Sequence, residues 1–242
     1  MIFIINGERY PIRAGDIYVI NGDTSHGFEN ATNLELYNIM FIPEMFSMWG
    51  NELKKLPGFQ ALFVLEPYYR KQQQFRNRLQ MAPGRREYPE DMLRVILEEF
   101  NEKREGYELV IDAYFKALVI FICREYTVKH SVMEKGILPL AEAFASIERD
   151  FLHPMNLLQL ATSVPISVRQ FIRVFKNNFG TTPMNHIILL RLRHACELMR
   201  AGKTGITGIA FDSGFSDSNY FTRQFRKHYG ITPRDFMKNM KV

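Results

Sequence analysis

The sequence predicts an α+β protein, with a strand-rich N-terminal part, a helical middle segment and an all-helical C-terminal part. Short apolar runs separated by Gly, Asn and Asp turn signals occupy the first 43 residues. From residue 44 onward, apolar residues recur at helical spacing. Charge is also divided unevenly, because residues 137–242 carry 14 Lys and Arg against 7 Asp and Glu, whereas residues 1–136 carry 17 against 19. The C-terminal part is therefore predicted to bind a polyanion.

The chain has 242 residues, of which 46% are hydrophobic, and this is enough for two ordinary domains. It contains no run of 18 consecutive apolar residues, so we expect no membrane span. Its first residues lack the basic leader of a signal peptide. Cys123 and Cys196 lie far apart on apolar helical stretches, and we expect them to be core thiols in a reducing cytoplasm.

The N-terminal strands are predicted from alternating or apolar runs that end at turn signals. The dipeptide Asn6-Gly7 is typical of a type I′ hairpin turn. Short strands at this spacing indicate a small barrel or sandwich. The expected strands are 2–5, 9–13, 17–20 and 34–42.

The middle segment is predicted to be helical. A proline and two acidic residues favour a helix start at Pro89. The last and longest helix is apolar on more than one side, so it lies either in the core or in a subunit interface, and the sequence leaves both open. The expected helices are 46–56, 67–81, 89–103 and 107–126, and a short polar linker follows at 131–136. The predicted domains are therefore 1–130 and 137–242.

Two helix-turn-helix motifs are predicted in the C-terminal domain. In the first, Asn156 caps helix 157–163 and Ser167 caps helix 168–179. In the second, helix 206–213 leads to Gly214 at a turn that needs positive φ, and Ser216 or Asp217 caps a helix that runs to about residue 228. Helices 137–150 and 183–199 precede and join the two motifs.

The second helix of each motif has one aromatic or apolar stripe and a polar outer face. The predicted buried stripes are Phe171, Val174, Phe175 and Phe179 in the first motif, and Tyr220, Phe221, Phe225 and Tyr229 in the second. A polar face that carries Asn and Arg suits the major groove, because Asn can read adenine and Arg can read guanine there. Composition alone would favour an ordinary helical hairpin with a solvated basic face. The candidate DNA-facing residues are Arg169, Ile172, Arg173 and Lys176, and Asp217, Ser218, Asn219, Thr222 and Arg223.

The order of the residues, unlike the composition, favours a DNA-binding motif over an ordinary helical hairpin. The segments ITGIA, GFSDSNYF and FRKHYGITPRDF resemble the signature of the AraC/XylS family of bacterial transcription activators, and a related pattern, SVRQFIRVFKNNFGTTP, occurs in the first motif. The sequence departs from the family at Gly208, where the family usually has Glu, and at Pro165, where it often has Gly. The resemblance implies a double helix-turn-helix domain that contacts two adjacent major-groove segments of double-stranded DNA, a partner RNA polymerase, and a homodimer formed by helices after the sensor.

The N-terminal stretch resembles the sensor of the same family, a cupin-like β-barrel. Gly15, His26 and Asn30 match fixed positions of the second cupin motif, whereas Asn21 and Asp23 stand where that motif has Pro and Gly. The first cupin motif is absent, so we expect the numbering to begin inside the barrel. His26 has no partner in sequence that would complete a metal site, and we predict neither a metal nor another cofactor.

Within the family, the segments GFSDSN, SVRQFIR, NGERY and DTSHGFENATNLELYNIMF resemble the L-rhamnose-responsive activators. This resemblance implies a small-molecule effector, a sugar, bound by the cupin-like domain near Tyr10, Arg13 and His26. By the same resemblance, Arg169 and Arg173, and Asp217, Asn219 and Arg223, contact bases, although Asp217 also suits a purely capping role. The predicted function is a regulator of a carbohydrate-utilisation operon, not an enzyme. Two alternatives stay open: a ligand-independent DNA-binding protein that uses a degenerate cupin for dimerisation, and a cupin enzyme.

Overall fold

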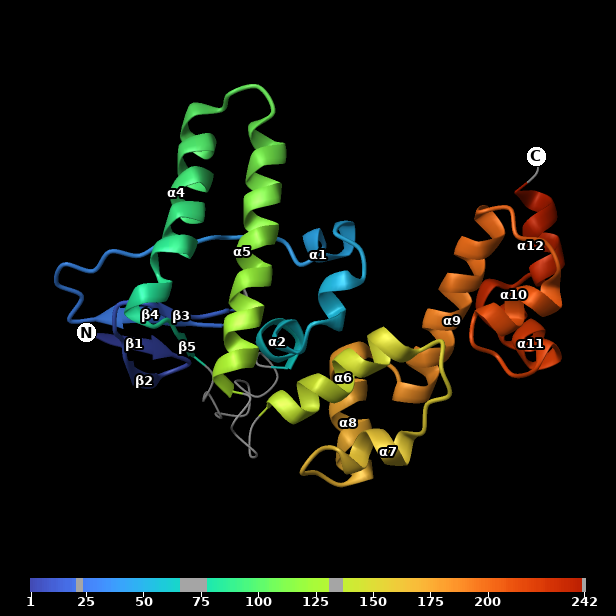
Figure 1. Cartoon of the computed structure of the whole chain (residues 1–242). Coiled ribbons are helices and arrows are strands. Elements are labelled where there is room, and N and C mark those ends of the chain that lie inside the picture. The colour runs from blue at the N-terminus through green and yellow to red at the C-terminus, as the bar shows by residue number, and fades with distance from the viewer. Residues whose placement is uncertain (21–23, 66–77, 131–136, 241–242) are drawn as a thin grey trace. The chain divides into compact units, whose positions relative to one another are not determined.

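A computed structural model describes residues 1–20, 24–65, 78–130 and 137–240 (Figure 1). It has the predicted α+β composition, with small antiparallel sheets and helices followed by an all-helical region. The chain divides into two compact units, Met1–Glu142 and Ala143–Val242. Of the helices that the structure describes, none is both long and apolar enough to cross a membrane.

The N-terminal sheet has three antiparallel strands in the order β2-β1-β4, namely β1 (Ile2–Ile5), β2 (Glu8–Pro11) and β4 (His26–Glu29). Asn6 and Gly7 both have positive φ and join β1 to β2, which confirms the predicted hairpin. Phe3 and Ile5 are buried on one face. A separate two-stranded sheet pairs β3 (Asp16–Ile17) with β5 (Leu79–Gln80).

The predicted barrel is not seen among the described residues, because these two small sheets do not join into one closed sheet. The expected strand 34–42 is wrong: this stretch pairs with no described strand, and several of its apolar residues, such as Leu36 and Tyr37, are exposed. The expected strand 17–20 retains only Ile17 within β3. Conversely, β4 was not expected, since its sequence HGFE has no apolar alternation.

The first helices of this unit differ from the prediction. The single helix expected at 46–56 is instead α1 (Met45–Met48) and a 3-10 helix, η1 (Glu52–Lys55), separated by Gly50 at positive φ. A short α2 (Pro57–Phe59) then continues into a π-helical turn, η2 (Gln60–Leu65). A Cβ on Gly58 would lie 2.0 Å from the Cys123 carbonyl oxygen, so only glycine allows this approach to the next long helix.

Most of the helix expected at 67–81 lies outside the described residues, and its end is wrong. Leu79 is buried and pairs with Ile17, so long-range strand pairing replaces the local helical pattern there. After a 3-10 turn, η3 (Pro83–Arg85), α4 spans Glu87–Glu102 and places Pro89 in its first turn rather than at its first residue. The expected linker, 131–136, also lies outside the described residues.

The longest helix, α5 (Tyr107–His130), contains the predicted helix 107–126 and extends past it. It packs antiparallel beside α4 (Figure 1) and contacts α2. Its buried residues are Phe115, Leu118, Val119, Ile122, Cys123 and Tyr126. Burial raises the pKa of the Cys123 thiol above its usual range, as expected for a core thiol.

Within its described residues, the second unit consists of helices joined by turns and loops, and its helices lie close to the predicted positions. Asn156 and Ser167 each accept a hydrogen bond from a backbone N–H in the first turn of their helices, which confirms these two predicted caps. Of the two candidates for the last cap, Ser216 and Asp217, it is Asp217 that accepts such a bond. The helices are α6 (Leu138–Asp150), which begins just before the unit, α7 (Leu157–Thr162), α8 (Val168–Phe179), α9 (Pro183–Arg200), α10 (Ile206–Asp212), α11 (Ser218–Tyr229) and α12 (Pro233–Asn239).

Replacing either of two glycines of the second motif with alanine should change the free energy of unfolding, and the two changes should have opposite signs. A Cβ on Gly208, inside α10, meets nothing within 4 Å, so Gly208→Ala should raise the free energy of unfolding by about 0.5–1 kcal/mol. Gly214 has φ +82°, and its Cβ would lie 2.6 Å from the Leu152 carbonyl oxygen, so Gly214→Ala should lower that free energy by at least about 1 kcal/mol. Denaturant titrations followed by circular dichroism measure both. Equal effects of the same sign would contradict this structure of the turn.

Candidate nucleic-acid interface

We call the second helix of each helix-turn-helix motif its recognition helix, which is α8 in the first motif and α11 in the second. The first recognition helix, α8, is held by an aromatic core. Phe144 of α6 contacts Phe171, Phe175 and Phe179, with ring centroids 4.7 to 5.7 Å apart. Phe171 and Phe175 are fully buried. Because these rings occupy one side of α8, the opposite side is exposed to solvent.

A buried polar pair ties α6 to the start of α9. His186 Nε2 and Glu148 Oε1 are 2.7 Å apart, and both side chains are almost inaccessible to solvent. The His186 ring also packs against Phe175 and Phe179, with centroids at 5.4 and 5.0 Å. Loss of either partner would leave the other polar group buried without this hydrogen bond, which would cost about 1–3 kcal/mol.

The second recognition helix, α11, packs through Phe221 and Phe225 against α9 and α10. Phe225 also contacts Tyr229, in the same helix, and Phe236 of α12. Burial, together with a hydrogen bond to Cys196, raises the pKa of Tyr229 to about 12. The core residues of this motif are Leu192, Ala195, Cys196, Met199, Ile209, Ala210, Phe215, Phe221 and Phe225.

The prediction that Tyr220 belongs to the buried stripe of the second motif is wrong. Its side chain is 37% exposed, and the Arg223 guanidinium carbon lies 5.8 Å from its ring centroid. The spacing already held the signal, because Phe221, Phe225 and Tyr229 recur every four residues and Tyr220 falls outside that series. Tyr220 therefore lies beside the exposed arginine, within range of a cation–π contact.

The two recognition helices are built to the same plan. Ser167 and Asp217 cap their starts, Gly180 and Gly230 end them in the left-handed conformation, and a capping threonine and a proline then begin the next helix. The residue spacing from cap to proline is the same in both motifs. Equivalent positions therefore have equivalent placements, which pairs Arg169 with Asn219 and Arg173 with Arg223.

The predicted DNA-facing residues separate into three groups. Exposed side chains belong to Arg169, Arg173, Lys176, Asn219 and Arg223, whereas Ile172, Ser218 and Thr222 are half-buried. The Thr222 hydroxyl donates to the Ser218 carbonyl oxygen at 2.9 Å. The Asp217 carboxylate accepts from the Asn219 backbone N–H at 2.8 Å, so it serves as the cap.

No described carboxylate forms an ion pair with Arg169, Arg173, Lys176 or Arg223, so the structure assigns their charges no local partner. Exposed, uncompensated arginines on the outer face of a capped helix are suited to phosphate and guanine contacts.

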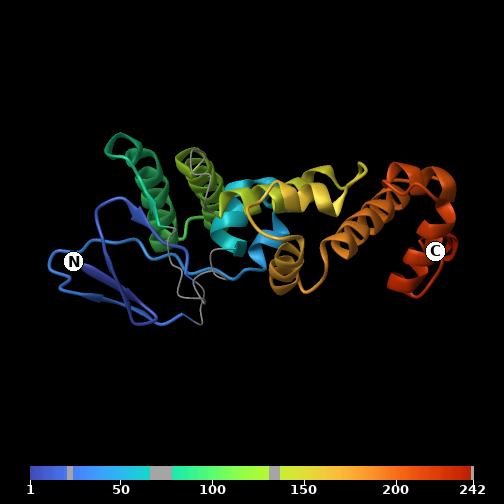
Figure 2. The same cartoon turned by 90° about the horizontal axis from the view of Figure 1, so that it is seen from below.

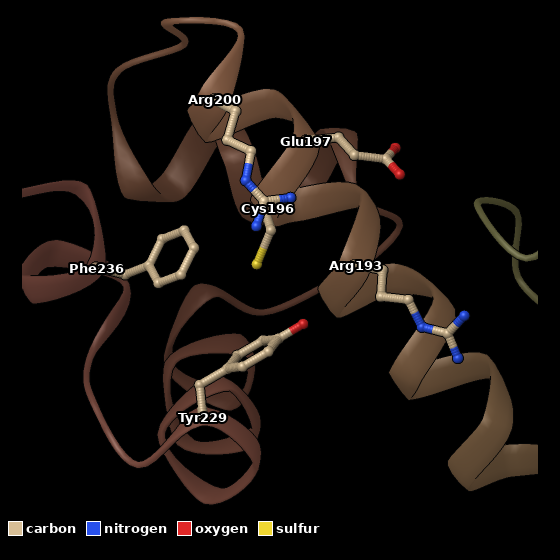
Figure 3. A pocket seen from close by; sticks show the side chains of 6 residues that line it. All are labelled: Arg193, Cys196, Glu197, Arg200, Tyr229 and Phe236. Carbon is tan, nitrogen blue, oxygen red and sulfur yellow. The ribbon is translucent and has the colours of Figure 1, made fainter. Parts of the chain in front are cut away.

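A shallow pocket of about 210 Å³ lies between α9, α11 and α12 (Figure 3). Figure 3 shows the Cys196 sulfur and the Tyr229 hydroxyl pointing toward it. Burial raises the pKa of Cys196, so its sulfur stays a thiol and is not a nucleophile at neutral pH. The pocket is lined by Arg193, Cys196, Glu197, Arg200, Tyr229 and Phe236.

The predicted effector residues are only partly brought together. Tyr10 lies opposite Phe3 and His26 lies opposite Ile5 in the antiparallel register, so Tyr10 and His26 share the face that carries Phe3 and Ile5. His26 is exposed, and its Nδ1 lies 3.0 Å from the Thr24 carbonyl oxygen. Arg13 follows β2 with an exposed side chain. Within the described ranges, no three His, Cys, Asp or Glu side chains cluster as a metal site would require.

Comparisons with known proteins identify two family domains in the chain. Residues 160–239 match the family described as helix-turn-helix domain, and residues 2–119 match the AraC-like ligand-binding domain. These matches define a helix-turn-helix transcription regulator with an AraC-like ligand-binding domain. The chain belongs to the AraC family of transcription regulators, which is not a family of enzymes.

Curated relatives and solved structures include members of the same family. The chain is 25% identical over 238 residues to the HTH-type transcriptional activator RhaS of Escherichia coli O1:K1 / APEC, which covers 97% of this chain and 80% of RhaS. An AraC-type regulator from Chromobacterium violaceum is 32% identical over 42% of this chain and 91% of its own, with a TM-score of 0.38. The DNA-binding domain of AdpA, solved with a target DNA, is 25% identical over the same shares, with a TM-score of 0.39.

Arg173 and Lys176 should differ in what they contribute to DNA binding. Arg173 lies one turn after Arg169 on the exposed face, so Arg173→Ala should weaken a cognate duplex by about 1–3 kcal/mol and barely change non-specific binding. Lys176 lies nearer the C-terminal end of α8, and recognition helices usually meet bases with their N-terminal residues, so Lys176→Ala should weaken all duplexes alike and make the salt slope shallower by about one unit.

Binding of each variant to a selected duplex and to its scrambled counterpart over a salt series measures both effects. If Arg173→Ala lost affinity equally for both duplexes, Arg173 would contact phosphate and not a base.

Proposed function

We propose that this protein is a cytoplasmic, sequence-specific activator whose two recognition helices enter adjacent major-groove segments on one face of double-stranded DNA. The observation that carries this proposal is the equivalence of α8 and α11, which share caps, spacing and an exposed arginine at the same position. Arg169, Arg173, Asn219 and Arg223 contact bases in this proposal. Ile172, Lys176, Ser218 and Thr222 line the same surfaces.

The helix between the two motifs has a suitable length. α9 has 18 residues and is therefore about 27 Å long. The two motifs pack at either end of α9 (Figure 2). Their recognition helices can therefore reach two DNA sites that are about 34 Å, or one DNA turn, apart. The excess of Lys and Arg over Asp and Glu in residues 137–242 supports binding to the phosphate backbone.

We assign residues 1–130 to a sensor, 131–136 to a linker and 137–242 to the DNA-binding domain. The match to an AraC-like ligand-binding domain supports a small-molecule effector. The resemblance to L-rhamnose-responsive activators favours a sugar that induces a carbohydrate-utilisation operon, with Tyr10, Arg13 and His26 as the candidate contacts. The relative RhaS is named an activator, which supports activation through RNA polymerase here.

A second candidate is a ligand-independent regulator whose sensor serves only for dimerisation. The described strands favour it in one respect, since they form two small open sheets rather than a barrel that encloses a ligand. Both candidates share the DNA-binding domain and differ in whether a small molecule changes DNA affinity.

Thermal unfolding with a panel of monosaccharides separates these candidates. An effector that binds the folded sensor raises the melting temperature by mass action, and at about 100 times its Kd it contributes about 2.7 kcal/mol. We expect one deoxy- or aldo-sugar to raise the melting temperature and to change the affinity for a selected duplex. A panel with no shift, together with unchanged, tight DNA binding, would favour the ligand-independent regulator.

We also propose that the protein forms a homodimer through the hairpin of α4 and α5. Leu97 and Phe100 near the end of α4 and Leu109 near the start of α5 are 49%, 60% and 77% exposed. In the sequence, these three residues come shortly before and shortly after the connection between the two helices, residues 103–106. Figure 1 shows α4 and α5 as an antiparallel hairpin. Apolar side chains gathered on an exposed surface are typical of a protein–protein contact.

Leu109→Lys should therefore shift the protein toward monomer in sedimentation velocity experiments at micromolar concentration. Leu158→Lys, on the comparably exposed apolar position of α7, is the matched control and should leave the association unchanged. A wild-type protein that is strictly monomeric would refute the dimer, and a shift equal in both variants would refute the assigned surface.

A further inference from the structure

Arg191, in the middle of α9, connects the two helix-turn-helix motifs directly. Its Nε donates to the Phe151 carbonyl oxygen at 2.6 Å, and its Nη2 donates to the His153 carbonyl oxygen at 2.8 Å. Residues 151–153 connect α6, which packs on α8 through Phe144, to α7, so they and α6 form one packed group with the first motif. The planar guanidinium thus holds that backbone segment with two hydrogen bonds of fixed direction.

The other side of the same guanidinium contacts the turn of the second motif. Its central carbon lies 5.9 Å from the Phe215 ring centroid, and a Cβ on Gly214 would lie 3.0 Å from Arg191 Nε. That Cβ would also lie 2.6 Å from the Leu152 carbonyl oxygen. The backbone of the first motif and the turn of the second therefore meet at Arg191, and a glycine at 214 leaves room for both.

Each motif also has an aromatic core with ring contacts of its own, although Phe215, which Arg191 contacts, belongs to the second core. The first core is built around Phe144, Phe171 and Phe175, and the second around Phe221 and Phe225. Among the ion pairs of the described residues, none involves Arg191. Burial lowers the pKa of Arg191 from its ordinary value, and the two carbonyl dipoles stabilise its charge in place of a carboxylate.

We propose that Arg191 is a positioning residue that fixes the second recognition helix relative to the first and thereby sets the spacing of the two DNA segments that the protein can bind. The spacing part rests on the proposed two-segment DNA binding, whereas the fixed geometry can be measured without DNA. Loss of Arg191 should leave each motif folded and loosen the angle between them.

The distance between the two recognition helices is measured by double electron–electron resonance on the full chain. Spin labels at Lys176→Cys and Arg226→Cys occupy equivalent exposed positions on α8 and α11, and dilution with unlabelled protein removes distances between subunits. Buried Cys123 and Cys196 are poorly accessible to the label. We expect a narrow distance distribution with Arg191, a clearly broader one in Arg191→Ala, and an unchanged one in Arg193→Ala, an exposed arginine of the same helix.

The consequence for DNA is measured with a duplex that the unlabelled wild-type protein selects from a random pool, and with the same duplex lengthened by two base pairs between its two segments. Wild type should lose about tenfold or more in affinity on the lengthened duplex, because a rigid link then engages only one segment at a time. Arg191→Ala should lose about tenfold on the selected duplex, yet discriminate far less between the two duplexes.

The proposal would be overturned if Arg191→Ala had the same distance distribution as wild type. It would also be overturned if the ratio of affinities for the selected and the lengthened duplex were the same in Arg191→Ala as in wild type. If Arg191→Ala loses helical circular dichroism, Arg191→Lys replaces it, since lysine keeps the charge but lacks the planar fork. It must then show a broader distribution than wild type for the proposal to stand. A wild-type footprint on a single segment would refute the proposed function and leave the distance test intact.

Discussion

Both recognition helices depend on α9. Phe175 and Phe179 of the first motif pack on its start through His186, and Phe221 and Phe225 of the second pack on its second half. Because the first motif packs on the start of α9 and the second motif packs on its second half, the position of one motif determines the position of the other. The aromatic stripes of α8 and α11 therefore do more than stabilise each motif, because they determine which faces of these helices point away from α9 and are free to contact DNA.

The distribution of polar contacts follows from this arrangement. Side chains that hold the frame are satisfied inside the protein: Glu148 with His186, Arg191 with two carbonyl groups, and Asp217 with the first turn of α11. Arginines on the outer faces of α8 and α11 have no described carboxylate nearby. Charges that are compensated fix the structure, and charges that are not compensated attract a polyanion.

The helical domain could be predicted from the sequence because its signals are local. Caps, a left-handed glycine and aromatic residues every four positions lie within one helix, so Ser167 and Gly214 were identified correctly and the cap of α11 was narrowed to Ser216 or Asp217, of which Asp217 is the cap. Strand pairing is decided by residues distant in the chain, and for that reason β5 replaced the end of an expected helix and 34–42 formed no strand. Tyr220 was misplaced because its type, an aromatic, outweighed its position. Arg191 carried no local signal, since its partners are backbone carbonyls about forty residues away.

The central claim, that two equivalent recognition helices on one rigid support contact two adjacent major-groove segments, is tested most directly by methylation interference on a duplex selected by the full chain. Methylation at guanine N7 blocks contacts in the major groove. The structure predicts two groups of interfering guanines on one face of the duplex, with centres about 10 base pairs apart. Interference confined to a single group, or two groups on opposite faces, would contradict it.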